Sequence, residues 1–476
     1  MKKKRNILFQ LLIAALTCLL GIAAAGCEDG RKETRSIKAA YADGKWIKDD
    51  SGRILILRGI NAGGDSKIPP FLPFEDVRCV EQIEGWGMNV VRYLVTWEGV
   101  EPNEGEYSRE YLDRVETIVN WFTERGIHVF IDMHQDLFTR KFCGDGAPEW
   151  AAVSDPAELP FECGQDWVGN YMSQSVIQSF DRFWTDTELQ DHFIKALTML
   201  AERFCDNDLV IGYDIFNEPW HGSFDYSSGD FEVNYLMPFY RRAINALREK
   251  DPEAIIFIEP AIFASGLLLT QSKLPALDFP NAVYSPHYYS LGAITGSEPD
   301  IDSAIEEIDE DLVLVLAKAG ELGTPAILGE YGSHPDQPGG LRLIQGYYEK
   351  LDKYMLGGTI WTYALRDLEW NNEGMSVISP DLSEREFLPA IERPYPMAIS
   401  GEPEEFYFDY DTGEFYLRFA SFGLSEPTLI YTAKSRHYPS GLNIEISGGI
   451  YELRDDGHII EYYSQSEGSH YLKITP

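Results

Sequence analysis

Two glutamates, Glu218 and Glu330, each end a short apolar run with the composition of a buried strand. The first run, residues 209–216, stops abruptly at Asn217-Glu218-Pro219. Because Pro219 excludes a helix here, the Glu218 carboxyl should project from the carboxyl end of its strand. Two carboxyl groups about 5 Å apart are what a retaining glycosidase requires, as nucleophile and as proton donor. We predict that the two glutamates face one another across such a site; the simpler alternative is that each one ends a strand in solvent.

The elements that must hold these glutamates alternate regularly along the chain. The predicted strands are 58–61, 89–95, 128–132, 209–216, 254–259, 282–289, 325–330 and 357–363. The predicted helices between them are 75–87, 109–125, 187–205, 234–250, 302–320 and 338–354. This α/β pattern predicts a TIM (β/α)8 barrel, whose active site lies at the carboxyl ends of the strands. An open doubly wound sheet is the alternative, but no glycine-rich phosphate turn follows the first strand.

Beyond Pro396 the pattern changes to short alternating runs without helices. These runs are 406–410, 414–419, 428–433, 442–447, 450–454, 458–463 and 471–475. Such strands predict a small β-sandwich. We therefore expect a catalytic barrel over 43–396 and a β-sandwich domain over 397–476, which packs against the barrel or, alternatively, binds carbohydrate or membrane.

The first residues have the composition of an export signal. A basic start (Lys2 to Arg5) and an apolar run (Ile7 to Ile22) precede small residues and Cys27. The arrangement resembles a bacterial lipoprotein signal, which implies cleavage before Cys27 and lipidation of its thiol. We predict a signal peptide over 1–26 and a tether over 27–42. The product is then either a membrane-anchored lipoprotein or, with plain secretion, a free exported protein.

Charge and cysteines limit the classes of function. The chain of 476 residues has 77 acidic and 40 basic side chains, a net charge of −37. This balance argues against nucleic acid as a partner and against a general attraction to anionic membranes. The acids are scattered, as on a solvated surface, and we expect a monomer. Cys143 and Cys163 flank a long loop, where an oxidising compartment permits a disulfide.

Several further side chains that fit the same site lie within or just after other predicted strands. They are Arg92, His134, His287, Tyr289 and Trp361, and Asp136 follows His134 closely. Arg92 is suited to orient the nucleophile and keep it ionised. Each histidine alone could be structural, and His134 with Asp136 lacks a third metal ligand at a suitable spacing, so we expect neither metal nor cofactor. The Trp361 indole could stack on a sugar or, alternatively, belong to the core.

The order of these residues resembles glycoside hydrolase family 5 over about residues 45 to 370. The matching positions are Arg92, His134, Asn217-Glu218-Pro219, His287 with Tyr289, Glu330 and Trp361. The resemblance implies Glu218 as acid/base and Glu330 as nucleophile. It also implies that Asn217 contacts the substrate 2-hydroxyl and that Tyr289 lies beside the nucleophile.

Other motifs look similar to the endoglycoceramidase branch of that family. They are Asp132-Met133-His134-Gln135-Asp136, the stretch Phe142 to Trp150, Arg58-Gly59-Ile60-Asn61 with Lys67 and Pro69, and Arg393-Pro394-Tyr395-Pro396. Enzymes of this branch release the intact glycan from a glycosphingolipid. The resemblance implies that the first sugar is held by Lys67, His134, Asp136 and Trp361.

Alternatives remain open at this point. Glucosylceramidases and sterylglucosidases share the His-Gln-Asp signature, and an endo-β-glucanase would need a long open cleft of tryptophans. A catalytically silent glycan-binding surface lipoprotein is the non-enzyme alternative, but binding alone does not need both Glu218 and Glu330. A lipid substrate also predicts an apolar channel lined by the loops 68–74 and 137–168; alternatively, their aromatic residues form a small core of their own.

Overall fold

The computed structural model describes residues 38–164, 167–262, 271–290 and 300–476. The predicted signal peptide and Cys27 lie outside these residues. The predicted tether ends earlier than expected, because Ala40–Asp43 forms strand β1, which pairs with β2 (Trp46–Asp49). A strand of four residues carries too little periodicity to be distinguished from a linker in the sequence.

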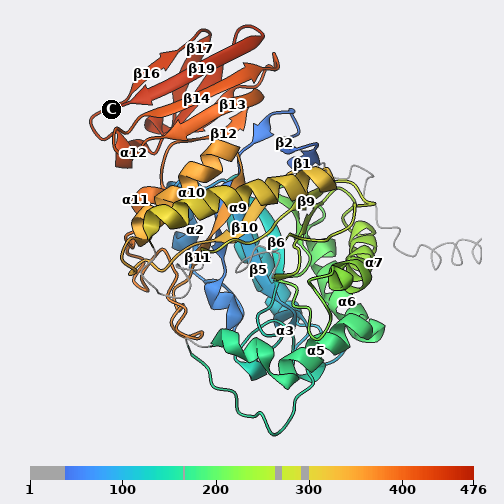
Figure 1. Cartoon of the computed structure of the whole chain (residues 1–476). Coiled ribbons are helices and arrows are strands. Elements are labelled where there is room, and N and C mark those ends of the chain that lie inside the picture. Colours follow the sequence, from blue (N-terminus) through green and yellow to red (C-terminus); the bar gives the residue numbers. More distant parts are fainter. Residues whose placement is uncertain (1–37, 165–166, 263–270, 291–299) are drawn as a thin grey trace, which may run out of the picture. The chain divides into compact units, whose positions relative to one another are not determined.

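Eight parallel strands form one sheet in the order β10-β11-β4-β5-β6-β7-β8-β9 (Figure 1). Their bounds are β4 Arg58–Ala62, β5 Val90–Thr96, β6 His128–His134, β7 Val210–Asp214, β8 Ile255–Ile258, β9 Ala282–Tyr284, β10 Ile327–Tyr331 and β11 Gly357–Tyr363. A parallel bridge between Tyr284 and Ala326 joins the two edges. Gly329 N–H also donates to Pro286 O at 3.1 Å, so the sheet closes as the predicted barrel.

The barrel helices follow the predicted ranges closely. They are α2 Val77–Gly85, α4 Arg109–Thr123, α6 Thr187–Phe204, α7 Met237–Arg248, α9 Ile301–Leu322 and α10 Gly340–Tyr354. Side-chain caps explain several of their starts: Asp76, Ser108 and Asp186 each accept backbone N–H groups of the first turn. Gly323, with φ +70°, ends α9 in the left-handed conformation that glycine adopts without strain.

The long predicted loop after β6 contains a helix that sequence analysis missed. Helix α5 (Gln174–Thr185) buries Phe180, Phe183 and other apolar residues in the core. Three short helical turns precede it in the same segment: η2 Arg140–Phe142, η3 Glu149–Ala151 and η4 Trp167–Met172. The predicted disulfide between Cys143 and Cys163 is confirmed, with their Cα atoms 5.3 Å apart. The disulfide therefore closes a loop between Cys143 and Cys163, ahead of η4.

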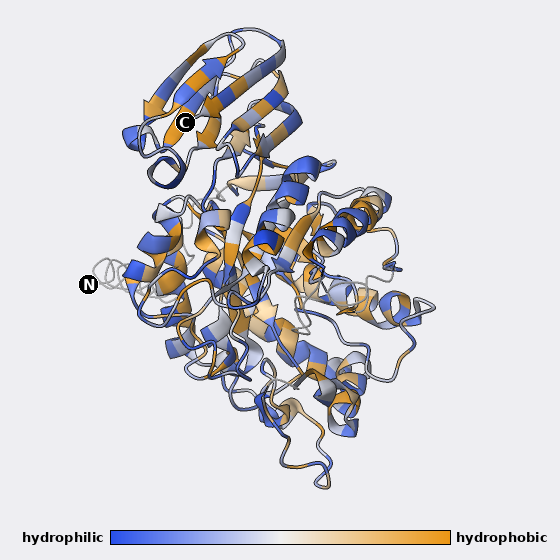
Figure 2. Ribbon diagram, turned by 60° about the vertical axis from the view of Figure 1, so that its left-hand side comes forward, coloured by the Kyte–Doolittle hydropathy of each residue, from blue (hydrophilic) through white to orange (hydrophobic). Residues whose placement is uncertain are grey.

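Two antiparallel sheets form the predicted β-sandwich, in the orders β1-β2-β3-β12-β15-β18-β17 and β13-β14-β19-β16. The remaining bounds are β3 Ile54–Leu55, β12 Tyr395–Ile399, β13 Gly401–Phe408, β14 Phe415–Ser421, β15 Thr428–Tyr431, β16 Asn443–Ile446, β17 Ile450–Arg454, β18 Ile459–Tyr463 and β19 Gly468–Thr475. Figure 2 shows hydrophobic and hydrophilic residues alternating along these strands, so that one side of each sheet faces the shared core.

The boundary between the domains differs from the prediction in one respect. Ala398 of β12 pairs with Leu55 of β3, so the strands before the barrel belong to the sandwich sheet. The predicted boundary at 396/397 falls inside β12. The sequence pattern identifies a strand but not its partner, which is why the N-terminal strands were assigned to the barrel.

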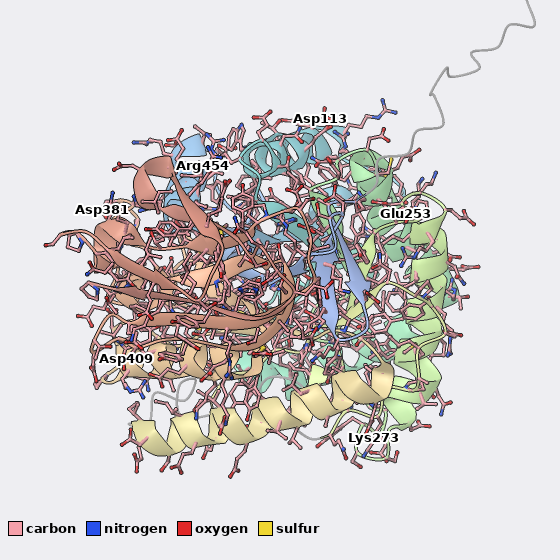
Figure 3. The ribbon with its side chains drawn as sticks, turned by 90° about the horizontal axis from the view of Figure 1, so that it is seen from above. Asp113, Glu253, Lys273, Asp381, Asp409 and Arg454 are labelled. Atoms are coloured by element: carbon pink, nitrogen blue, oxygen red, sulfur yellow. A yellow bond between two sulfur atoms is a disulfide. The ribbon has the colours of Figure 1, made fainter. Side chains whose placement is uncertain are left out.

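The acidic surplus is spread over the surface, as predicted. Figure 3 places Asp113, Glu253, Asp381 and Asp409 at separate margins of the view, and all four are exposed. In the described part of the chain, no helix combines the length and the apolar character needed to cross a lipid bilayer.

Asp352 of α10 lies between two buried arginines that join the barrel to the chain before β12. Arg58 Nη2 and Arg393 Nη1 each donate to Asp352 Oδ1 at 3.0 Å. All three side chains are buried. Replacing Asp352 by alanine should lower the free energy of unfolding by about 3–5 kcal/mol, because both guanidinium groups lose their carboxylate. Chemical denaturation followed by tryptophan fluorescence measures this change.

The matched control is Glu349→Ala, which removes an exposed ion pair with Arg342 on the same helix. This variant should change the free energy of unfolding by less than about 1 kcal/mol. Similar losses for the two variants would contradict a structural role specific to Asp352.

Candidate active site

Glu218 and Glu330 lie together at the carboxyl ends of their strands, as the prediction requires. Glu330 belongs to β10, and Glu218 follows β7 after a turn. One carboxylate oxygen of each glutamate and one ring nitrogen of His287 all lie within 4.8 Å of one another. This spacing leaves room for one reacting carbon between the two carboxyl groups.

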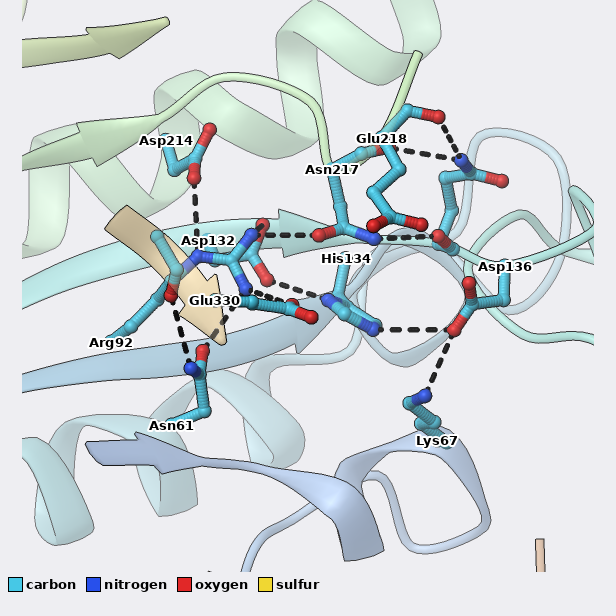
Figure 4. Close-up of polar contacts among 12 residues, drawn as sticks. Asn61, Lys67, Arg92, Asp132, His134, Asp136, Asp214, Asn217, Glu218 and Glu330 are labelled. Atoms are coloured by element: carbon cyan, nitrogen blue, oxygen red, sulfur yellow. Dashed lines mark hydrogen bonds and ion pairs between the residues drawn. The ribbon is translucent and has the colours of Figure 1, made fainter. Parts of the chain in front are cut away.

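Arg92 lies beside Glu330 and is completely buried (Figure 4). It projects from β5 on the inner face of the barrel, and its guanidinium group contacts residues from several strands. The hydrogen-bond acceptors, at 2.7 to 3.1 Å, are Asn61 Oδ1, Asp214 Oδ2, Asn217 Oδ1, Glu259 Oε1 and Glu330 Oε1. It also forms an ion pair with Asp132 at 3.0 Å. Arg92 thus fixes one Glu330 oxygen, and Tyr289 OH donates to the other at 2.8 Å.

The backbone of Glu218 adopts a left-handed conformation, with φ +43°, that side-chain-bearing residues rarely take. Its N–H donates to Glu259 Oε2 at 2.9 Å, and its C=O accepts from Gln135 Nε2 at 3.2 Å. The amide of Asn217 is held by Arg92 and by Gln135 O, the latter at 2.9 Å. Because strained backbone persists only where surrounding contacts hold it, these contacts aim Glu218 into the site.

His287 links the two glutamates from the side. Its Nδ1 lies 2.9 Å from Glu218 Oε1 and 3.6 Å from Glu330 Oε2, and its Nε2 lies 3.1 Å from Glu259 Oε1. Arg92 and His287, which the sequence placed among the substrate-binding residues, have no exposed side-chain surface. Both contact Glu330, and each would act on a substrate through the glutamates.

The residues expected to hold the first sugar form a second cluster. Lys67 Nζ lies 2.9 Å from Asp136 Oδ2 and lies over the ring of Trp361, 4.4 Å from its centroid. His134 Nδ1 contacts Asp132 Oδ2 at 2.7 Å, and its ring is parallel to that of Trp361 at 5.6 Å. Charged groups and an aromatic face thus converge beside Glu330, which suits a polyhydroxylated ring.

With this geometry in place, the comparisons identify the family. The family model described as cellulase (glycosyl hydrolase family 5) matches residues 57–366, and the glycoside hydrolase family 5 C-terminal domain matches residues 393–475. The chain belongs to glycosyl hydrolase family 5.

Several relatives cover nearly the whole chain. Endoglycoceramidase I of Rhodococcus hoagii (strain 103S) is 28% identical over 458 residues, which cover 92% of this chain and 88% of the relative. The solved ganglioside GM3 complex of endo-glycoceramidase II from Rhodococcus sp. has a TM-score of 0.79 at 28% identity and covers 91% of this chain and 100% of that chain. The lactosyl-enzyme intermediate of the same protein has a TM-score of 0.77 at 29% identity, with coverage of 91% and 99%.

Sequence reasoning missed three residues of this family 5 site. Glu259 follows β8, and its Glu259-Pro260 pair repeats the Glu218-Pro219 pattern, which was a usable signal. Glu373 Oε1 lies 3.1 Å from Lys67 Nζ, and the Trp370 ring centroid lies 3.7 Å from the same atom. Both belong to the loop after β11, whose return to the site no local pattern indicates.

Two aromatic residues of the predicted lipid-channel loop lie in the core instead. Phe138 packs against Phe180 with ring centroids 5.2 Å apart, and Phe142 packs against Phe161 at 5.1 Å. Phe138 and Phe142 are buried. These two residues therefore belong to the main apolar core of the barrel rather than to a separate core of the loop.

Three groups of possible metal ligands in the ranges that the structure describes each include a carboxylate that contacts Lys67 or Arg92. Among the described residues, three groups of ligand atoms are close enough together: His134/Asp136/Asp145, Asp214/Glu259/His287 and Glu218/His287/Glu330. Lys67 contacts the first group, and Arg92 contacts the other two. Each group therefore contains at least one carboxylate that is paired with a positive charge of the protein.

The pKa values of the two catalytic candidates are shifted in opposite directions. Burial raises the pKa of Glu218, although the contact with His287 opposes the shift. Burial acts in the same direction on Glu330, but the positive charges of His287 and Arg92 outweigh it and lower its pKa. At a pH between the two pKa values, Glu218 is protonated and Glu330 is ionised, which suits the acid and the nucleophile respectively.

These shifts predict a bell-shaped pH dependence of kcat/KM. As the pH falls through the lowered pKa of Glu330, protonation removes the ionised carboxylate and the rate falls. As the pH rises through the raised pKa of Glu218, loss of the proton removes the acid and the rate falls again. Values of kcat/KM on a soluble aryl β-glycoside, measured from about pH 3 to 10, give the two limbs. Because the two carboxyl groups interact, the apparent pKa of each limb describes the pair rather than one residue. A profile with a single limb would contradict this account.

Proposed function

We propose that this family 5 enzyme is an endoglycoceramidase, which hydrolyses the bond between the glycan and the ceramide of a glycosphingolipid with retention of configuration. Glu330 is the nucleophile and Glu218 the acid/base. The observation that carries this assignment is the pair of carboxyl groups within 4.8 Å whose pKa values are shifted apart, upward for Glu218 and downward for Glu330.

The reaction takes two steps. A carboxylate oxygen of Glu330 attacks the anomeric carbon, the bond to the ceramide oxygen breaks, and that oxygen takes the proton of Glu218. Glu218 then removes a proton from water, whose oxygen displaces Glu330 from the anomeric carbon and restores both carboxyl groups. Arg92 and Tyr289 each donate to one oxygen of Glu330 and so orient it in both steps.

The cluster around Lys67 suits the first sugar. Lys67 lies 2.9 Å from Asp136. Burial raises the pKa of Asp136, but Lys67 and His134 together outweigh it and lower this pKa to about 2. Burial lowers the pKa of His134, but the neighbouring carboxylates, Asp132 foremost, together outweigh it and raise this pKa to about 10. Both groups stay ionised over the working pH range and offer fixed donors and acceptors to sugar hydroxyls. Asn217 keeps one amide N–H for the 2-hydroxyl, since its other contacts use Oδ1 and one N–H.

Exposed apolar side chains support a lipid leaving group. Met172 is 70% and Leu368 62% exposed. Met172 belongs to η4, which also carries Trp167, and Leu368 lies two residues before Trp370; the rings of these tryptophans are 4.8 Å apart. Both apolar residues are thus close in sequence to the pair of tryptophans, of which Trp370 lies over Lys67, and a ceramide chain could lie along them. The named endoglycoceramidase relatives match the chain over both domains.

A substrate panel tests this proposal. A ganglioside, glucosylceramide, a steryl glucoside and soluble cellulose are incubated with the enzyme, and products are identified by mass spectrometry. We expect the intact ganglioside oligosaccharide and ceramide, and Glu330→Gln should slow this release at least about 1,000-fold. Cleavage of glucosylceramide or steryl glucoside without ganglioside would favour those activities. Cleavage of cellulose alone would overturn the glycolipid assignment.

We further propose that the enzyme is exported and anchored through a lipid on Cys27, and that it acts as a monomer. The basic start, the apolar run and the small residues before Cys27 support this localisation. In a bacterial host, the wild-type chain should fractionate with membranes and incorporate labelled fatty acid. Cys27→Ala should abolish the label and release the protein into the soluble fraction. A wild-type chain that is unlabelled and soluble would contradict the anchor and leave plain secretion.

A further inference from the structure

Glu259 is a buried carboxylate with contacts to three parts of the active site. It follows β8, has no exposed surface, accepts two hydrogen bonds and forms an ion pair with His287. Glu259 Oε2 accepts the backbone N–H of Glu218 at 2.9 Å. Glu259 Oε1 lies 3.1 Å from both Arg92 Nη2 and His287 Nε2. No substrate can reach it directly.

The three partners of Glu259 are the groups that hold the catalytic pair. Arg92 donates to Glu330 at 2.7 Å, and His287 contacts Glu218 at 2.9 Å and Glu330 at 3.6 Å. The backbone N–H that Glu259 accepts belongs to the strained residue Glu218 itself. A displacement of Glu259 would therefore move both carboxyl groups relative to one another.

We propose that Glu259 is a positioning residue of the hydrolysis, which fixes the direction of Glu218 through its backbone and orients His287 and Arg92 against Glu330. This inference rests on the proposed roles of Glu218 and Glu330. Glu259 acts only through these neighbours, because it touches neither the substrate nor the reacting atoms.

The groups around Glu259 determine its electrostatic effect. The titratable and charged side chains that face it are Arg92 of β5, Asp214 of β7, Tyr240 of α7, Tyr284 of β9 and His287. Burial and the nearby Glu259 hold the pKa of Asp214 well above its usual range, which favours its neutral form. Burial disfavours the cation of His287, but Glu259 and Glu330 together hold its pKa well above the usual value.

Removing the charge of Glu259 should therefore move the pH profile in a defined direction. His287 would lose its proton at a lower pH than in the wild type. Its positive charge lowers the pKa of both Glu218 and Glu330, so its loss raises both values. The loss of the Glu259 charge acts in the opposite direction, but His287 contacts both carboxyl groups directly and its effect should prevail.

The test is Glu259→Gln, which keeps the shape of the side chain and can still accept the Glu218 N–H. On a substrate that the wild type hydrolyses, kcat should fall about 100-fold while KM changes less than about threefold, because the reacting groups are misaligned but the sugar contacts remain. Both limbs of the kcat/KM profile should move to higher pH. A variant that is folded, with kcat within about threefold of wild type and an unshifted profile, would overturn the proposal.

Glu232→Gln is the matched control. Glu232 is also buried and accepts the Ala261 N–H at 3.0 Å; its other hydrogen bonds within the described residues come from Ser272 and Lys273, which lie outside the site. This variant should leave kcat and the pH profile unchanged. If it lost activity to the same extent, the effect of Glu259→Gln would reflect general packing and the proposal would fail.

A measurement without turnover separates this inference from the proposed function. The chain has nine histidines, and nitrogen-15 NMR of labelled imidazoles, assigned with His287→Gln, reports the protonation of His287. Its titration should move to lower pH in Glu259→Gln but not in Glu232→Gln. An unmoved titration would overturn the proposal. An inactive wild type with a moved titration would instead reject only the substrate assignment.

Discussion

The structure depends on one buried guanidinium group. Arg92 has no exposed surface and lies among Asp132, Asp214, Glu259 and Glu330, which come from separate barrel strands or the residues just after them. Carboxylates cannot stay ionised inside a protein without a paired cation. The planar fork of arginine can serve several acceptors at once, which the point charge of lysine could not. Arg92 thus allows an acidic site to exist in the centre of a barrel.

The barrel interior accordingly has two layers with different chemistry. Val90 and Phe130 belong to an apolar cluster with Phe257, whose ring stacks on Phe130 at 4.2 Å. Two residues further along their strands, Arg92 and Asp132 face the same interior. Because side chains on one face of a strand recur every second residue, the same strands supply both an apolar floor and a charged upper layer.

The sugar side of the site depends on loops rather than strands. Asn371, in the loop after β11, donates to Cys143 O at 2.7 Å and accepts from Gly164 N at 3.1 Å, so it contacts the chain on both sides of the disulfide. The neighbouring Trp370 donates to Gly144 O at 3.2 Å. These contacts place Trp370 over Lys67 and form a wall from two segments far apart in the chain. Loops on a rigid barrel are where such enzymes differ in substrate.

The sequence alone determined the barrel, the sandwich and the two glutamates at strand ends, since period, strand length and Pro219 are local signals. It also indicated that Cys143 and Cys163 could pair. Only the tertiary structure decided that β1 to β3 belong to the sandwich and that α5 occupies the long segment after β6. It alone brought Glu259 beneath Glu218 and Glu373 to Lys67. Pairing partners and the path of a loop depend on contacts between distant residues, which no local pattern encodes.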